Sequence, residues 1–235
     1  MYGSRKLETL SSAFSDRCGL TSVDLPSSLT TIDDAAFDQC TSLGSVSALP
    51  EGLSSIGHRA FYMCPLTSIS LPSTLTFIGR YAFSRTHLSS FALPDGFTTF
   101  GEGWLCQCGS LVSVSLPSSL TSIGEYAFSE SSLPSITLPE GVTTIGERAF
   151  WKCPALTSIT LPSSLTSIGE YAFEEVPLPW IALPDSLTLI DEGAFMWCGS
   201  LALVYVPDGC EVRSLAFRGT GGYTFGRGPP APPSS

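Results

Sequence analysis

The stretch LPSSLTSIGEYAF occurs unchanged at Leu116–Phe128 and again at Leu161–Phe173. The two copies begin 45 residues apart, and the chain from Leu66 to Ser200 divides into three 45-residue segments that align without a gap. Two identical runs of this length indicate that a unit was duplicated. Self-similarity at a short, fixed period is typical of a solenoid, in which repeated coils stack on one another.

Each 45-residue unit contains two coils. An Ala-Phe pair lies once in each coil, except that Trp104 and Leu105 take its place in one of them. A proline preceded by Leu or Val recurs in steps of 22 to 24 residues, at Pro26, Pro50, Pro72, Pro94, Pro117, Pro139, Pro162, Pro184 and Pro207. The sequence therefore predicts about ten coils of 22–24 residues.

Residues 156–173 show what one coil should look like. Ile159 and Leu161 alternate with polar residues, which predicts a half-buried strand, and Pro162 ends the strand because it has no amide hydrogen to donate. Residues 164–169 repeat the alternation and end at a glycine suited to a turn. Residues 170–173 are too few for a stable helix, so we expect a short helical turn whose Phe173 fills the core. The predicted fold is mainly β with short helical turns.

The composition excludes several classes of protein. Of the 235 residues 43% are hydrophobic, which excludes a wholly disordered chain, yet no apolar run approaches the roughly 18 residues of a membrane span. The formal net charge is −10, and Lys6 and Lys152 are the only lysines. With no basic surface to offer, the chain is not expected to bind nucleic acid or an anionic membrane.

The repeated pattern LxxIxLPxxLxxIGxxAFxxC, seen at 156–173 and completed by Cys153 and Cys198 in other coils, resembles the BspA-type leucine-rich repeat. The resemblance extends over about residues 7–218. It implies a leucine-rich-repeat solenoid with a binding role and no catalytic activity. It also implies a cell-surface or secreted protein whose partner is a host-matrix or cell-surface protein.

The pattern divides the chain into two parts. Residues 1–219 are expected to form the solenoid, which starts partway through a repeat because Leu7–Phe14 matches its second half. Neither end shows the polar capping unit that an open solenoid usually needs, and the first residues lack the pattern of a secretory signal. Residues 220–235 are rich in Gly and Pro, and we expect a disordered tail there.

The cysteines are expected to be reduced, buried parts of the core. Five of the eight stand three residues after the Phe of the Ala-Phe pair or after Leu105, which takes its place, where leucine-rich repeats often place a buried Asn. Pairing among the cysteines of the first coils, Cys18, Cys40 and Cys64, remains an alternative. Cys210 stands outside this column and is expected to be exposed. Cys106 and Cys108 lack nearby partners for zinc, so no metal site is predicted.

No catalytic or cofactor motif is present. His58 and His87 occupy different positions of neighbouring coils, and the chain contains no phosphate-binding loop, HExxH helix or GxSxG elbow. Carboxylates recur directly after the Ile-Gly step, and we interpret this column as a solvated acidic ridge, with weak cation binding as the alternative: Asp34, Glu102, Glu125, Glu147, Glu170 and Glu192. The sequence therefore predicts no enzyme, no cofactor and no metal.

The outward face of the first strand is the predicted partner-binding surface. Its positions carry hydroxyls such as Ser158 and Thr160, but near the C-terminal end they carry Trp180, Leu203 and Tyr205. Exposed aromatic residues are typical of binding hot spots. The alternative is that residues 220–235 fold over them as a cap. We therefore expect a non-catalytic protein-binding module of a surface or adhesion protein. The alternative is a structural spacer or repeat fragment without a ligand of its own.

Overall fold

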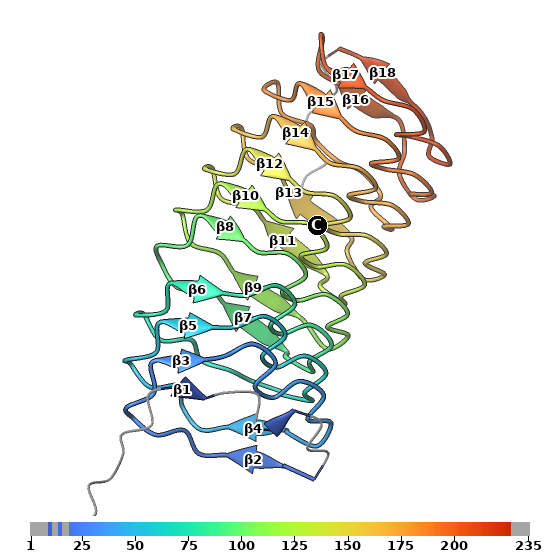
Figure 1. Cartoon of the computed structure of the whole chain (residues 1–235). Coiled ribbons are helices and arrows are strands. Elements are labelled where there is room, and N and C mark those ends of the chain that lie inside the picture. Colours follow the sequence, from blue (N-terminus) through green and yellow to red (C-terminus); the bar gives the residue numbers. More distant parts are fainter. Residues whose placement is uncertain (1–8, 11–13, 16–18, 227–235) are drawn as a thin grey trace, which may run out of the picture.

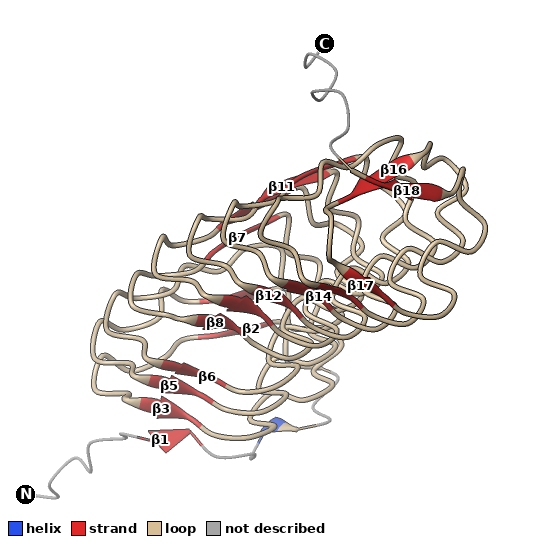
Figure 2. Ribbon diagram, turned by 90° about the horizontal axis from the view of Figure 1, so that it is seen from above, coloured by secondary structure: helices blue, strands red, loops and turns tan. Residues whose placement is uncertain are grey.

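The computed structural model describes residues 9–10, 14–15 and 19–226. The chain forms a rod of stacked coils, with β1 at one end and β17 and β18 at the other (Figure 1). Two rows of short strands run along the rod on different sides (Figure 2). This arrangement confirms the predicted mainly β solenoid, with nine turns between β1 and β17.

The second strand of each coil joins a row of parallel strands, with one break between β6 and β8. Each strand pairs with the equivalent strand of the next coil, so that Ile123 pairs with Ile145, and Ile145 with Ile168. These isoleucines point inward and are almost fully buried. The ten strands are β1 (Thr9–Leu10), β3 (Thr31–Ile32), β5 (Ser55–Ile56), β6 (Phe77–Ile78), β8 (Thr99–Phe100), β10 (Ser122–Ile123), β12 (Thr144–Ile145), β14 (Ser167–Ile168), β15 (Leu189–Ile190) and β17 (Glu211–Val212).

The first strands of the coils form only two-stranded pieces, β2-β4, β7-β9, β11-β13 and β16-β18. Around Ile181 no strand forms, and Pro177 and Pro179 just before it have no amide hydrogen for a ladder. The strands of this row are β2 (Ser22–Val23), β4 (Ser45–Val46), β7 (Ser90–Ala92), β9 (Ser113–Ser115), β11 (Ser135–Thr137), β13 (Ser158–Thr160), β16 (Val204–Val206) and β18 (Tyr223–Phe225).

The segment around each Ala-Phe pair is a series of tight turns, and from residue 19 onward none of these segments is helical, contrary to expectation. Tyr126 and Glu130 have φ values of 53° and 56°, in the left-handed region. The N–H groups of Tyr126, Phe128 and Glu130 donate to carbonyl oxygens of the next coil at 2.7 to 2.9 Å, whereas that of Ser129 donates back to Tyr126. Every second N–H group of the turn therefore donates to the neighbouring coil. These bonds form a third ladder of hydrogen bonds beside the two rows of strands, in the place where a helical turn was expected.

Stacked phenylalanines form the centre of the core. From Phe128 to Phe217 consecutive rings lie nearly parallel, with centroids 5.2 Å apart. The stack is interrupted where Leu105 replaces phenylalanine. There Phe91 and Phe100, from β7 and β8, fill the space: the ring centroids of Phe100 and Phe128 are 4.5 Å apart. Together these rings keep one continuous core through the solenoid.

The cysteine column lies against the phenylalanine stack. The thiols of Cys64, Cys153 and Cys198 donate hydrogen bonds of 2.8 to 3.0 Å to the carbonyl oxygen of the stacked phenylalanine in the preceding coil. Burial raises the pKa of each of these three thiols to about 12. Cys40 and Cys64 are fully buried, as expected of core residues, and Cys64 is a free thiol, whereas Cys18 lies outside the described residues.

Cys210 is also buried, contrary to expectation. It stands three residues after Pro207, where the equivalent positions after Pro162 and Pro184 hold the buried Leu165 and Leu187. The thiol therefore takes a leucine position in the core.

The last described residues continue the solenoid. β18 pairs with β16 in parallel, with Tyr205 opposite Thr224, and the Tyr223 ring packs on Phe217 with centroids 4.8 Å apart. β18 falls within the 220–235 segment that was expected to be a tail, and residues 227–235 lie outside the described part. Since β18 lies beside β16, it extends the sheet at this point.

Candidate functional site

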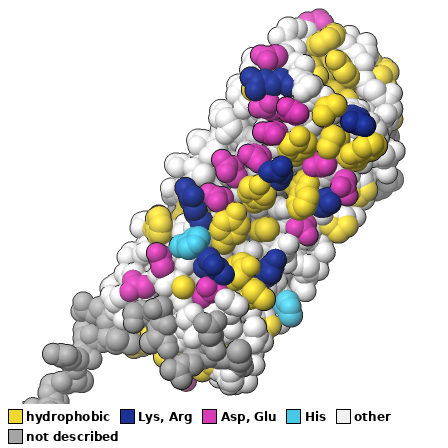
Figure 3. Space-filling view, turned by 45° about the vertical axis from the view of Figure 1, so that its right-hand side comes forward, with side chains coloured by type: hydrophobic (Ala, Val, Ile, Leu, Met, Phe, Trp, Pro, Cys, Tyr) yellow, Lys and Arg dark blue, Asp and Glu magenta, His cyan; other side chains and the backbone are white. Residues whose placement is uncertain are grey.

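Charged and hydrophobic side chains gather on one face of the rod (Figure 3). The face is built from the outward positions of the turns, which are the two residues after the Ile-Gly step and the two after the Ala-Phe pair. We call this surface the turn face. Its aromatic, Met and cationic side chains are Arg59, Tyr62, Met63, Arg80, Tyr81, Arg85, Tyr126, Arg148, Trp151, Lys152, Tyr171, Met196, Trp197 and Arg218.

The turn face carries, beside its carboxylates, residue types that are common at protein interfaces. Tyr, Trp, Met and Arg are the residue types enriched at such interfaces. Four of the seven tyrosines and five of the nine arginines of the chain stand here. The Trp197 side chain is 50% exposed.

Arg148 occupies the middle of the turn face. Its Nη1 donates to the hydroxyl of Tyr126 at 2.7 Å and contacts the carboxylate of Glu147. Its guanidinium carbon lies 5.0 Å from the centroid of the Tyr171 ring and 5.7 Å from that of Tyr126. The cation is therefore held by two tyrosines, from the preceding and the following coil, and by a carboxylate, in a geometry that favours guanidinium.

Two further clusters repeat this combination of cation, ring and carboxylate. Lys152 lies 4.6 Å from the centroid of the Trp151 ring and forms a salt bridge of 3.2 Å with Glu175. The Arg59 guanidinium lies 4.2 Å from the Tyr62 ring centroid and pairs with Asp38 at 3.4 Å. The Lys152–Glu175 pair is exposed and contributes at most about 1 kcal/mol to stability, whereas Asp38 in the Arg59 pair is buried. Both pairs hold long side chains in place along the surface.

In two coils the turn position that corresponds to Arg148 is a glycine. Gly103 and Gly193 have φ values of 63° and 61°. A Cβ atom at Gly103 would lie 2.3 Å from the ring of Tyr81, and one at Gly193 would lie 2.4 Å from the ring of Tyr171. Each tyrosine ring therefore lies over the glycine of the next coil. Burial and the carboxylate of Glu102 raise the pKa of Tyr81 to about 12.

The hydroxyls beside the second strands serve mainly to join the coils. Thr121, Thr143 and Thr166 each donate a side-chain hydrogen bond to a backbone carbonyl of the preceding coil, at 2.9 to 3.2 Å. Because these hydroxyls are already satisfied, this side offers few specific donors to a partner. The turn face carries greater chemical variety.

The residues singled out from the sequence lie on the other row of strands. Ser158 and Thr160 are exposed in β13. Trp180 is half-buried and belongs to no strand, while Tyr205 is half-buried in β16. Leu203, just before β16, is 47% exposed. The sequence analysis identified the carboxylates of the turn face but missed its aromatic residues. A signal for this surface was present in the sequence: the residue type at these turn positions differs from coil to coil, while the neighbouring Ile, Ala and Phe positions hardly change.

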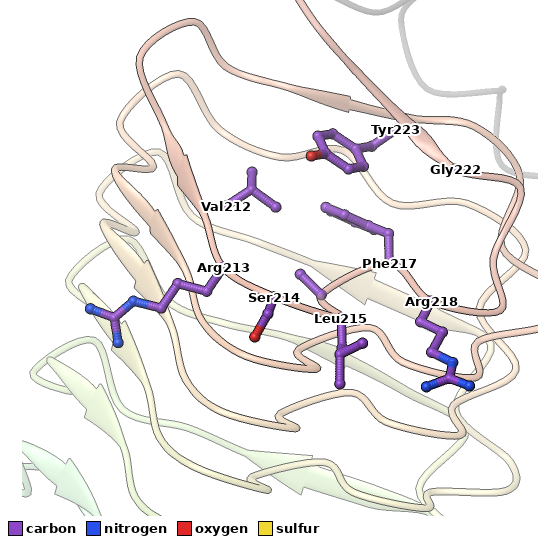
Figure 4. Close-up of a pocket in the computed structure, with 9 residues that line it drawn as sticks. Val212, Arg213, Ser214, Leu215, Phe217, Arg218, Gly222 and Tyr223 are labelled. Atoms are coloured by element: carbon purple, nitrogen blue, oxygen red, sulfur yellow. The ribbon is translucent and has the colours of Figure 1, made fainter.

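A hollow of about 540 Å³ lies at the C-terminal end of the described solenoid (Figure 4). Phe217, Tyr223 and Val212 line its apolar part, and Arg213 and Arg218 stand at opposite ends of it. Its lining contains no His, Cys or carboxylate residue. In the described part of the chain, no group of three or more His, Cys, Asp or Glu side chains is placed to hold a metal ion.

These features define a leucine-rich-repeat solenoid. The model of the BspA-type leucine-rich-repeat region matches six copies, in residues 8–133 and 121–224. The chain therefore belongs to the BspA-type leucine-rich-repeat family, as the sequence pattern predicted.

Several solved structures are similar to this chain. A leucine-rich-repeat protein of T. pallidum shares 33% identity, with 72% of this chain and 69% of that one covered and a TM-score of 0.47. A leucine-rich cell-surface protein of Faecalibacterium prausnitzii shares 22%, with 89% and 80% covered and a TM-score of 0.44. A leucine-rich-repeat protein of Bacteroides ovatus shares 22%, with the same coverage and a TM-score of 0.40.

A search of curated proteins finds no match to the chain. Within the described residues, no helix has the length and apolar character needed to cross a bilayer.

Proposed function

We propose that this protein is a non-catalytic protein-binding module that contacts its partner through the turn face. The observation that carries the proposal is the concentration of Tyr, Trp, Met and Arg on this face, beside strands whose hydroxyls are used between coils. Membership of the repeat family supports an interaction role. As part of the same proposal, the partner is a host-matrix or cell-surface protein, and the chain acts at the cell surface or after secretion.

The backbone of the turn face suits it to binding. Hydrogen bonds such as those from Tyr126, Phe128 and Glu130 to the next coil fix every turn in relation to its neighbour. The side chains above them are held by rings and carboxylates, as at Arg148. A surface that is ordered before binding loses less conformational entropy when the partner arrives.

The chemistry of the core supports a role without catalysis. A cysteine nucleophile needs a depressed pKa, whereas burial raises those of Cys64, Cys153 and Cys198 to about 12. Repetition also supplies copies of one environment, whereas catalysis needs unlike groups that converge.

The surface formed by Trp180, Leu203, Tyr205, Ser158 and Thr160 is the second candidate. The exposure of Leu203, together with the partial exposure of Trp180 and Tyr205, favours it. Both surfaces can be tested in one experiment because they lie on different sides of the coil.

The test begins with capture of proteins from extracellular-matrix and cell-lysate fractions on the immobilised full chain. A captured protein is identified, purified and titrated against the unmodified chain, a Trp151→Ala/Trp197→Ala variant and a Trp180→Ala/Tyr205→Ala variant. The proposal expects saturable binding that only the first variant loses. Loss in the second variant alone would assign the site to the first strands. No saturable partner for any chain would favour a structural spacer or repeat fragment without a ligand of its own.

A further inference from the structure

At the C-terminal end of the described solenoid, backbone N–H groups that bind the next coil elsewhere have no acceptor. In the preceding coil the N–H of Phe195 donates to the carbonyl of Ala216 at 2.7 Å. The equivalent donors of the last coil are those of Leu215, Phe217 and Gly219, and none of them meets an acceptor among the described residues. The φ values of Leu215 and Gly219 are 60° and 83°, so the turn keeps the conformation that presents these groups to a further coil.

Side chains at core positions of the repeat are also uncovered at this end. Tyr223 and Phe225 of β18 pair with Val204 and Val206 of β16 and hold the same positions of the repeat. The two valines are 1% and 0% exposed, whereas Tyr223 and Phe225 are 43% and 53% exposed. No described coil lies over the two aromatic residues, and the hollow shown in Figure 4 lies beside Tyr223. The end therefore presents an unfinished core to its surroundings.

Both rows of strands have an unpaired edge at the same end. Within the described part of the chain, β17 pairs only with β15, and β18 pairs only with β16. An unpaired edge presents N–H and C=O groups to which a strand of another chain can add. Residues 227–235 are poorly suited to add that strand, because four of the nine are prolines without an amide hydrogen. The chemistry of this end therefore favours a strand from another chain.

The opposite end of the described solenoid offers the matching elements. There β1 pairs only with β3 and β2 only with β4, so each row of strands has a second unpaired edge. Phe14 is half-buried at this end and stacks on Phe37, with ring centroids 5.6 Å apart. The order of the rows also matches. Because β18 belongs to the row of first strands and β1 to the row of second strands, β1 is the kind of strand that the repeat places after β18.

We propose that a second copy of this chain docks head to tail on the C-terminal end, with its β1 beside β17 and its β2 beside β18. The contact is continuous with the interface between adjacent coils, and it uses the same strand pairing and ring stacking. Because the two ends differ, the contact does not close on itself, and further copies extend it into a filament. Each copy contributes ten described strands to the row of second strands and so adds about 48 Å. The inference goes beyond the proposed function and does not involve the turn face.

The test is the association of the full chain at a physiological salt concentration, which screens the repulsion from its net charge of −10. Sedimentation equilibrium should show a mass that rises with concentration beyond that of a dimer, and electron microscopy should show filaments with a repeat of about 48 Å. A chain that stays monomeric up to about 1 mM would mean that residues 227–235 or a different partner cover the end, and would overturn the inference.

A pair of matched variants tests the C-terminal end. Phe225→Asp buries a charge in the contact and should weaken association at least about tenfold. The control is Phe77→Asp on β6, away from both ends, where the phenylalanine is 54% exposed compared with 53% at Phe225. This control should leave association unchanged, and equal weakening by the two variants would overturn the inference.

A variant of the other end tests the direction of the contact. The Leu10 carbonyl accepts from Asp33 of the next coil, so the backbone groups of the neighbouring Thr9 face the free edge of β1. Thr9→Pro therefore removes an N–H from that edge and leaves the pairing with β3 intact. Each variant alone should be monomeric, whereas a mixture of Thr9→Pro with Phe225→Asp should form dimers that grow no further. Thermal denaturation checks that both variants are folded. Undiminished association of Thr9→Pro alone would indicate contact between two C-terminal ends and would overturn the head-to-tail arrangement.

Discussion

The thiol of Cys153 donates a hydrogen bond to the backbone carbonyl of Phe128, 3.0 Å away in the preceding coil. The hydrogen bond joins adjacent coils. Cys153 follows the stacked Phe150 of its own coil and donates to the carbonyl of the stacked Phe128 in the preceding coil. In the coil that carries Thr86 in place of Cys, the threonine hydroxyl donates to the carbonyl of Phe83 at 2.8 Å. The position therefore takes a small buried side chain, which in most coils can donate a hydrogen bond, whereas Val176 in the same position after Phe173 has no donor.

Replacement of this donor should destabilise the protein. Cys153→Ala removes the donor to a buried carbonyl, and we expect the free energy of unfolding to fall by about 1 to 3 kcal/mol. Cys153→Ser keeps a donor in the same position and should cost less. Urea denaturation of the two variants provides the measurement. Equal losses would mean that the thiol contributes by its volume alone.

Alkaline pH should weaken the fold through the same thiols. Burial raises the pKa of Cys64, Cys153 and Cys198 from 9.0 to about 12, so the folded chain keeps protons that the unfolded chain has lost. Stability from this source is fully present below pH 9 and is lost as the pH rises from about 9 to 12, by up to about 1.4 kcal/mol per pH unit for each thiol. Urea denaturation between pH 8 and 11 measures the slope.

The control for this pH dependence is a chain in which the three cysteines are replaced by serine. Its stability should fall less steeply above pH 9, because a serine hydroxyl does not titrate there. An identical slope in the two chains would assign the alkaline loss to other groups.

The phenylalanine stack should carry much of the stability. Phe128 is fully buried between Phe100 and Phe150, with centroids at 4.5 and 5.2 Å. Phe128→Ala should cost about 3 to 5 kcal/mol, as is usual for a phenylalanine removed from a core. Phe77, which is 54% exposed on β6, is the control, and Phe77→Ala should cost far less. A loss below about 1 kcal/mol at Phe128 would contradict its place in the core.

The sequence predicted the coils well because their period and alternation are properties of the chain itself. Ile159 and Leu161 alternate with hydroxyl residues, and the strand β13 has the expected pattern of burial. Cys210 was misjudged because it replaces a leucine at a position recognisable only by counting from Pro207. Composition alone did not mark it as a core position.

The turns could not be predicted from one coil. Tyr126 and Glu130 adopt left-handed φ values because this conformation directs the N–H groups of alternate residues to carbonyl oxygens of the next coil. Their acceptors stand 21 residues further along the chain, so the short segment EYAF gave no local sign of them. The turn face was missed for a related reason. Tyr171 and Trp197 lie far apart in sequence, and only stacking of the coils places them on one surface.

Because the coils stack closely at Gly79, a side chain at this position should destabilise the protein. A Cβ atom there would lie 2.3 Å from the backbone nitrogen of His58 in the preceding coil, and backbone cannot move aside as a flexible side chain can. Gly79→Ala should therefore destabilise the protein by about 1 to 3 kcal/mol, as overpacking of a core does. Gly44, which has no heavy atom within 4 Å of an added Cβ, is the matched control. Gly44→Ala should be neutral or slightly stabilising, because it removes freedom from the unfolded chain. Thermal denaturation of the two variants measures the difference, and equal melting temperatures would show that the coils separate at little cost.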